Sequence, residues 1–430
     1  MMPQKFRCGK AAAMPSCLLA LCLLGCGASQ TSVTVSVPTP GKSIWVSTWA
    51  DAPDSLAGSA SAEQTFREIV KPTVGSRGTV RLHFSNYFGT TPVTLGAVHV
   101  GAQTSGAGVT GDMPVTFNGA TSATIPAGGF LLSDALSLTF SYGAVLSVTE
   151  YVSGSWLGLT QHSQGINIVT NYATVANAGN KTSDTAGTSF TRQSFSTFLL
   201  DRVDVYGSYA ETIAAFGSST TDGYQSGVDQ HKTYPEQLAA ALHAAGRDDV
   251  AIANVGIAGT TVLGSQATSG VNRFGRDVLG LPGVTAVIDY LGANDLRDNC
   301  VSAATLIAGK QNIIAQAHNA QLKLYLAVTA PSTFCGAQNP SGFGSRFAQG
   351  SGEEAQRFLL LGWEKATQAT TISGTSEQPP GADAVIDFNG VLADPANLSY
   401  MLSSLDSGDD IHPTGAGYSV MVTAIPLTLF

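Results

Sequence analysis

The feature that most constrains the fold of this 430-residue chain is a change of pattern near residue 208. Beyond it, short apolar runs alternate with stretches of helical character. The apolar runs cover 212–216, 250–253, 285–291, 322–328 and 384–388. The helical stretches cover 235–245, 303–320, 352–370 and 415–427. This alternation predicts right-handed βαβ units and a parallel sheet covered by helices on both faces.

The part of the chain before residue 208 has a different pattern, made of short runs with alternating apolar and polar residues. In 79–85 (TVRLHFS) the alternation is strict, so Val80, Leu82 and Phe84 share one face of a half-buried antiparallel strand. Glycine- and asparagine-containing turns separate such runs, and no long helical period appears. An all-β sandwich of jelly-roll type is therefore expected over 43–208.

The N-terminus is typical of a bacterial export signal. Three basic residues precede a short apolar run, which is too short for a permanent transmembrane helix. Residues 23–26 (LLGC) resemble a lipobox, in which Cys26 is lipidated after cleavage. An ordinary signal peptide cleaved near Ala28 is the alternative. We expect an exported lipoprotein of the cell envelope, or else a secreted or periplasmic protein, with no membrane contact other than this anchor.

These patterns divide the chain into a lipoprotein-type signal peptide over 1–25, a polar tether over 26–42, a β-sandwich domain over 43–208 and an α/β domain over 209–430. At 430 residues the chain is longer than a single hydrophobic core usually grows, which also favours two domains. The formal net charge of −9 argues against a nucleic-acid partner.

Two cysteines, Cys300 and Cys335, remain once those of the signal segment and Cys26 are set aside. An even pair in an exported chain favours a disulfide, and two unpaired thiols are the alternative. Neither cysteine belongs to a close Cys/His cluster, so no zinc site is expected. No Gly-x-Ser-x-Gly sequence occurs either, which leaves a nucleophile elbow of that type unsupported.

Polar segments follow the ends of the apolar runs in the α/β region. Ser219 follows the first run, and a serine becomes a nucleophile only when a base removes its proton. Asp409 and His412 form an acid–base pair in which the acid would orient the imidazole. Asn294 and the glycine-containing segment 254–261 offer neutral N–H donors for an oxyanion. Taken singly, each also suits a structural role: a helix N-cap, a surface histidine, an Asx turn and a tight turn.

The order of these segments resembles the SGNH (GDSL-type) hydrolase family. Residues 217–223 (GSSTTDG) resemble its Gly-Asp-Ser block, and 254–259 (NVGIAG) resemble its glycine block. Residues 292–295 (GAND) match the Gly-x-Asn-Asp block, and 409–412 (DDIH) match the Asp-x-x-His block. One departure is Ser218, which stands where the family has an aspartate. The resemblance implies a flavodoxin-like three-layer α/β fold and ester hydrolysis without a metal or other cofactor.

Carried over residue by residue, the resemblance implies a catalytic triad of Ser219 as nucleophile, His412 as general base and acid, and Asp409. It implies an oxyanion hole formed by the backbone N–H groups of Ser219 and Gly259 and the side chain of Asn294. The expected activity is hydrolysis of short acyl or acetyl esters, on a small molecule, a glycan or a lipid. The alternative is a glycan-binding protein with a catalytically inactive scaffold of this family.

The N-terminal region resembles the β-domain that precedes the catalytic domain in a bacterial subgroup of these esterases. The residues that carry this resemblance are 45–50 (WVSTWA) and 81–89 (RLHFSNYFG). Its tryptophans, Trp45, Trp49 and Trp156, would suit stacking on sugars, although core packing is the commoner role of tryptophan.

Overall fold

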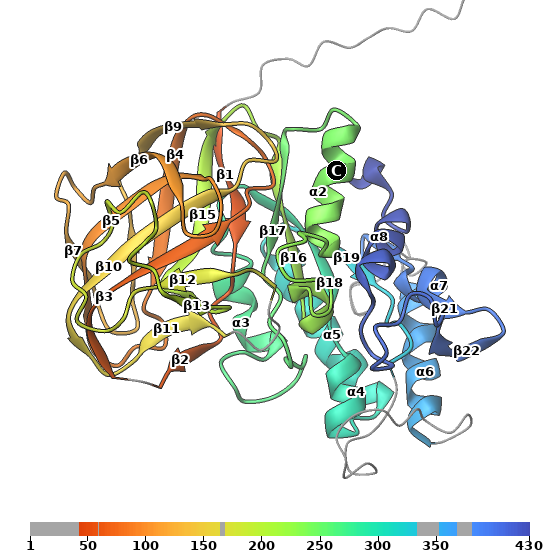
Figure 1. The fold of residues 1–430 in the computed structure, drawn as a ribbon. Coiled ribbons are helices and arrows are strands. Elements are labelled where there is room, and N and C mark those ends of the chain that lie inside the picture. Colours follow the sequence, from red (N-terminus) through yellow and green to blue (C-terminus); the bar gives the residue numbers. More distant parts are fainter. Residues whose placement is uncertain (1–42, 59, 164–167, 333–351, 368–380) are drawn as a thin grey trace, which may run out of the picture. The chain divides into compact units, whose positions relative to one another are not determined.

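The change of pattern near residue 208 separates antiparallel sheets from a parallel sheet (Figure 1). The described residues after it also include one short antiparallel pair, β21 (Ala393–Asp394) and β22 (Asn397–Met401). The computed structural model describes residues 43–58, 60–163, 168–332, 352–367 and 381–430, which all fall in one compact unit. The expected signal peptide and tether, with Cys26, lie outside the described residues, and so does Cys335. Lipidation and the Cys300–Cys335 disulfide therefore stay predictions. No helix in the described ranges is long and apolar enough to span a membrane.

The N-terminal region consists of antiparallel sheets. In one sheet the strands lie in the order β1 (Ile44–Ala50), β15 (Leu200–Gly207), β4 (Ser76–Ser85) and β8 (Phe130–Leu132), and β9 (Leu136–Phe140) also pairs with β4. In the second the order is β13 (Arg192–Ser194), β12 (Asn171–Ala173), β3 (Ser61–Val70), β10 (Leu146–Trp156), β5 (Val93–Gln103) and β6 (Val109–Val115), and β7 (Ala123–Ile125) pairs with β5. A small third sheet contains β14 (Thr197–Phe198), β11 (Leu159–His162) and β2 (Ser55–Ala57).

One hydrophobic core joins the two larger sheets. Val80, Leu82 and Phe84 on β4 are all fully buried, as their alternation predicts. They belong to the same core as Val100 on β5 and Val148 on β10, which come from the other sheet. The two sheets therefore bury their apolar faces against each other, and the expected β-sandwich is confirmed. We call this region, residues 43–208, the sandwich.

The C-terminal region contains a parallel five-stranded sheet. Its strands lie in the order β17 (Val250–Asn254), β16 (Glu211–Gly217), β18 (Val284–Tyr290), β19 (Lys323–Ala327) and β20 (Ala384–Ile386). Numbered along the chain this order is 2-1-3-4-5, which is the flavodoxin-like arrangement. The predicted α/β fold is confirmed.

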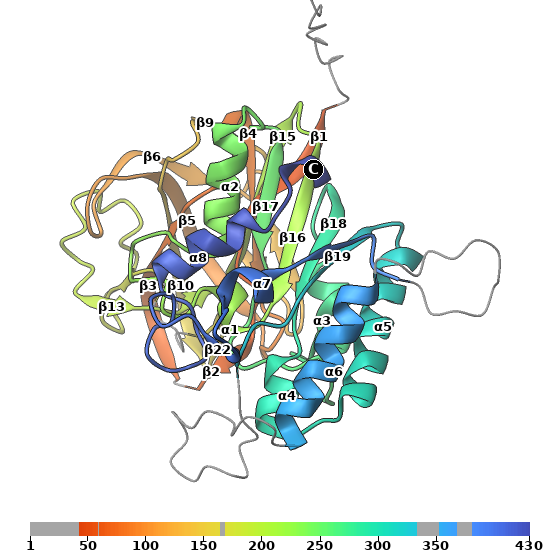
Figure 2. The same ribbon diagram turned by 90° about the vertical axis from the view of Figure 1, so that its right-hand side faces the viewer.

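Helices cover both faces of the parallel sheet (Figure 2). On β16, Ala214 and Phe216 join one core with α3 (Gly270–Asp277), α5 (Ala303–Asn319) and α6 (Gly352–Ala366). Ile213 and Ala215 join the other core with α2 (Tyr234–Ala244), α7 (Phe388–Leu392) and α8 (Gly415–Thr423). Because both faces of the sheet are buried, the sequence of each strand is a continuous apolar run.

The last expected helix and the last expected strand both end early, and each has a local cause. The final helix α8 ends at Thr423, because Pro426 lacks the N–H that would continue the hydrogen-bond ladder. The last apolar run forms a strand only as far as Ile386. Asp387 then accepts a hydrogen bond from the Gly390 N–H and caps α7.

The sandwich contacts the parallel sheet at its β17 edge. The Thr73 hydroxyl donates to the Ile252 carbonyl (2.9 Å) and accepts from the Ile252 N–H (3.0 Å). On the neighbouring strand, the Thr212 hydroxyl accepts a hydrogen bond from the Ser47 N–H (2.9 Å). An open sheet edge would otherwise present unpaired backbone groups, and the sandwich satisfies some of them. It therefore lies beside the first two strands of the sheet.

Candidate active site

The predicted site residues follow the carboxyl ends of adjacent parallel strands. Ser219 follows β16, Gly259 follows β17 and Asn294 follows β18. The strand order reverses beside β16, since the chain passes first to β17 on one side and then to β18 on the other. In an open α/β sheet, such a switch point at the carboxyl edge is where ligands bind.

Ser219 begins the short helix α1 (Ser219–Asp222) and is half-buried. Its Oγ lies 2.7 Å from Nε2 of His412, a residue 193 positions later in the chain. The turn before it needs a glycine, because a Cβ on Gly217 would lie 1.8 Å from the Thr221 hydroxyl and 3.0 Å from the Tyr290 carbonyl oxygen. Ser218 is buried, and its side chain does not cap α1. The hydrogen bond to His412 is therefore made by Ser219, the serine that the resemblance implies as nucleophile.

Asp409 holds the other side of the His412 ring. His412 Nδ1 lies 2.6 Å from Asp409 Oδ2, and Asp409 Oδ1 accepts from the backbone N–H groups of His412 (2.8 Å) and Ile411 (2.9 Å). Burial alone would raise the pKa of Asp409, but the hydrogen bond and charge of His412 and these backbone donors lower it to about 2. An ionised carboxylate only accepts, so Nδ1 carries the proton and Nε2 is free to accept one from Ser219.

Asn294 lies in the same small hollow as Ser219. It is buried in the first turn of α4 (Ala293–Asn299), 3% exposed. Its Nδ2 donates to the Thr260 carbonyl (2.8 Å), and its Oδ1 accepts from Arg297 (3.1 Å). These bonds orient the amide and use one of its two N–H groups, which leaves the second for a ligand.

Gly259 occupies a backbone conformation that favours glycine. Its φ of +74° lies in the left-handed region, and the residue is exposed. The neighbouring Thr260 carbonyl binds Asn294, so the loop after β17 and helix α4 are joined beside Ser219. The structure therefore brings Ser219, Asn294, Asp409 and His412 together, and it places the Gly259 loop next to them.

Two further polar residues support this loop, and the sequence suggested no role for either. Asp295 accepts from the N–H groups of Val262 (2.8 Å) and Leu263 (3.0 Å) with its two carboxylate oxygens. Asn254 donates to the Thr221 carbonyl (2.9 Å) and accepts from the Gly256 N–H (3.0 Å). Both lie inside the motif segments, so their positions were visible in the sequence but their partners were not.

The hollow that contains Ser219 is small. The described residues enclose about 20 Å³ there, with Leu291, Asn294 and Ile411 among the lining residues. This is room for a group of about the size of a water molecule or a methyl.

A much larger hollow opens beside Gly259. It has a volume of about 710 Å³, and most of its lining side chains carry hydroxyl, amide or carboxylate groups. Gln266 and Asp298 lie on the α/β side, while Asp54 and Ser163 come from the sandwich. We call this hollow the polar cleft.

The tryptophans that would have suited sugar stacking pack against the protein instead. Trp156 is 6% exposed and lies in the sandwich core, against which Trp49 also packs. The Arg81 guanidinium covers the ring of Trp45 at 4.1 Å. Trp156 and Trp49 therefore pack in the sandwich core, whereas Trp45 lies half-buried beneath Arg81.

A parallel α/β sheet that carries a serine, a histidine and an aspartate hydrogen-bonded in series is the arrangement of serine hydrolases. Residues 215–420 match the model of the GDSL-like lipase/acylhydrolase family. This part of the chain belongs to that family, and the protein is a hydrolase. The resemblance noted in the sequence is thus confirmed.

Several solved structures are also similar to the chain. The aryl esterase of M. smegmatis has 18% identity and a TM-score of 0.37, and the match covers 50% of this chain and 96% of that one. A carbohydrate acetylesterase from Sinorhizobium meliloti has 15% identity and a TM-score of 0.35, covering 50% and 95%. The lipase/acylhydrolase from Enterococcus faecalis has 19% identity and a TM-score of 0.36, covering 50% and 92%. The comparison with curated proteins found no match.

Proposed function

We propose that the protein is a serine esterase that removes short acyl groups from a polar, hydroxyl-rich carrier such as a glycan. One observation carries the proposal: Ser219 Oγ, the His412 ring and the Asp409 carboxylate form a continuous series of hydrogen bonds of 2.7 and 2.6 Å. This series supplies both the base that a serine nucleophile requires and the acid that orients the base.

In the proposed reaction, Ser219 Oγ attacks the ester carbonyl carbon as its proton passes to His412 Nε2. The carbonyl electrons move to the oxygen, which Gly259 and Ser219 N–H groups and the Asn294 amide stabilise. The bond to the carrier oxygen then breaks, and that oxygen takes the proton from His412. Water attacks the acyl-enzyme in the same way, with His412 as base, and the Ser219 oxygen recovers its proton as the acid leaves.

The two hollows support the choice of substrate. The small hollow beside Ser219 has room for a short acyl group, whereas the polar cleft has room for a larger alcohol. Hydroxyl, amide and carboxylate side chains such as those of Asp54, Ser163 and Gln266 suit a partner rich in hydroxyl groups. An acylated glycan therefore fits the described walls better than a long-chain lipid ester does.

The experiment compares turnover of p-nitrophenyl esters of increasing chain length, and of acetylated xylan, by the purified protein. We expect acetate esters to be the best of the series and Ser219→Ala to abolish turnover while the protein stays folded. Covalent labelling by a fluorophosphonate, located by peptide mass spectrometry, should fall on Ser219 and not on Ser218. Absence of turnover in the wild type would refute the proposal and favour a glycan-binding role.

A further inference from the structure

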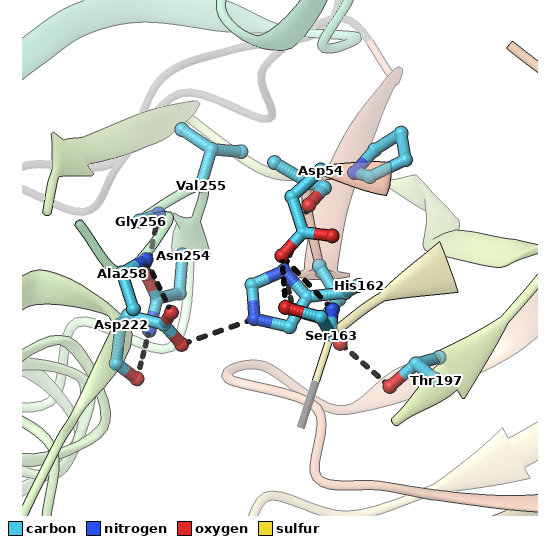
Figure 3. Close-up of polar contacts among 12 residues, drawn as sticks. Asp54, His162, Ser163, Thr197, Asp222, Asn254, Val255, Gly256 and Ala258 are labelled. Carbon is cyan, nitrogen blue, oxygen red and sulfur yellow. Dashed lines mark hydrogen bonds and ion pairs between the residues drawn. The ribbon is translucent and has the colours of Figure 1, made fainter. Parts of the chain in front are cut away.

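A histidine of the sandwich contacts the helix that begins with the proposed nucleophile (Figure 3). His162 ends β11 and is 6% exposed. Its Nε2 lies 3.2 Å from Oδ1 of Asp222, the last residue of α1 and three positions after Ser219. The sandwich thus reaches the active-site segment through one buried side chain.

The surroundings of His162 indicate that both ring nitrogens carry protons. Nδ1 lies 2.8 Å from the Ala52 carbonyl oxygen, which only accepts hydrogen bonds, so Nδ1 must donate. Nε2 faces a carboxylate, which also accepts when ionised. Burial lowers the pKa of His162, but the charges of Asp51 and Asp222 outweigh burial and raise it well above its ordinary value. The ring is therefore a buried cation beside carboxylates.

Asp222 connects this cation to the oxyanion loop. Its Oδ2 accepts from the Ala258 N–H (2.9 Å), and Ala258 directly precedes Gly259. Asn254 donates to the Asp222 carbonyl (3.3 Å), and a Cβ on Gly256 would lie 2.3 Å from the Asp222 nitrogen. The loop thus packs directly on α1, and the Asp222 carboxylate holds the peptide that leads into Gly259.

The other two carboxylates near His162 have donors of their own. Asp51 Oδ1 lies 3.2 Å from His162 Nδ1, and Asp51 Oδ2 accepts a hydrogen bond from the Thr197 hydroxyl (2.6 Å). Asp54 accepts from the Ser163 N–H (3.0 Å) and hydroxyl (2.6 Å). Asp222 receives one backbone N–H and the His162 ring, so His162 supplies its only side-chain partner among the bonds of the described residues. Loss of the cation would leave Asp222 buried beside other acids, where its charged form is unfavourable.

We propose that His162 is a positioning residue for the esterase reaction, and this inference rests on the proposed function. By holding the Asp222 carboxylate ionised and in place, His162 keeps the Ala258 N–H bound and the Gly259 N–H aimed at the developing oxyanion. The sandwich then contributes to catalysis itself and does more than support the α/β region.

The test measures kcat and KM for p-nitrophenyl acetate per active site, with sites counted by complete fluorophosphonate labelling. His162→Leu should lower kcat about 10- to 100-fold and leave KM nearly unchanged, since removal of an oxyanion donor outright costs about 10²–10³. His162→Gln keeps a donor near the Nε2 position and should recover part of the loss. The matched control is His99→Leu, which removes another histidine paired with an aspartate in the sandwich (His99 Nδ1 to Asp112 Oδ2, 2.7 Å).

A double-mutant cycle keeps the inference testable if His162→Leu does not fold. Asp222→Asn and His162→Asn, whose shorter amide does not reach Asp222, should each lower kcat. The double variant should lose little more than either single one, because both break the same link. Independent, multiplicative losses would overturn the proposal, and so would a wild-type kcat per site in His162→Asn or an equal loss in His99→Leu. An inactive wild type would instead refute the proposed function.

Discussion

Asp409→Asn gives the sharpest test of the acid–base series, because its effect on stability follows from the pKa of the carboxylate. The pKa falls from 3.8 to about 2 in the folded protein. A lowering of this size corresponds to about 2 kcal/mol in favour of the folded state at pH 7. Asparagine is neutral, so the variant should lose about 2 kcal/mol of unfolding free energy at that pH.

The pH dependence has a defined sign. The folded pKa is depressed, so the stabilisation is complete above pH 4–5 and is lost as the pH falls towards 2. About half of the difference between wild type and Asp409→Asn should remain at pH 3. Turnover should fall on the order of 10⁴-fold, because the amide does not hold the imidazole in the tautomer that accepts the Ser219 proton.

Urea denaturation of both proteins at pH 7 and pH 3, with p-nitrophenyl acetate assays at pH 7, measures these quantities. Asp112→Asn is the control, since Asp112 also bonds a histidine Nδ1 but lies in the sandwich, and its activity should be that of the wild type. Equal urea midpoints for wild type and Asp409→Asn at pH 7 would refute the assignment of Asp409 as the ionised partner of His412. A stability difference that does not shrink at pH 3 would refute the electrostatic origin.

Three further predictions test the oxyanion hole, the turn before Ser219 and the lipobox. Asn294→Ala should lower the kcat of the folded protein about 10²–10³-fold, and kcat near the wild-type value would exclude its amide from the oxyanion hole. Gly217→Ala should destabilise the protein by about 1–3 kcal/mol, measured by urea unfolding, because its Cβ would lie 1.8 Å from the Thr221 hydroxyl. When the full chain is expressed in a bacterium supplied with labelled palmitate, the wild type should incorporate the label and Cys26→Ala should not. Equal labelling of the two proteins would exclude lipidation at Cys26.

Much of the α/β fold could be predicted because buried parallel strands leave a strong local pattern. Residues 212–216 form a continuous apolar run, since both faces of β16 are covered by helices. Val80, Leu82 and Phe84 alternate with polar residues, since only one face of β4 meets the sandwich core. In both cases the pattern of apolar and polar residues along the strand predicts which side chains are buried.

Other features could not be predicted, because their partners are far apart in the chain. Lys310 lies in an ordinary helical stretch, yet it is fully buried and pairs with Asp289 (3.3 Å) and Glu364 (3.5 Å). His162 lies in the sandwich and Asp222 in the α/β region, and the sequence around neither residue predicts their contact. A hydrogen bond between distant residues imposes no periodicity on the sequence around them.

By itself, the sequence indicated which residues meet at the proposed site. The four motif segments contain Ser219, Gly259, Asn294 and the pair Asp409 and His412. The apolar runs predict that the first three segments each follow a strand of one parallel sheet. Only the tertiary structure showed that the sandwich borders the β17 edge of the sheet and forms one wall of the polar cleft. It also showed that His162 of the sandwich contacts Asp222. The reason is physical: local patterns report which faces are buried, whereas the packing of whole sheets decides what they are buried against.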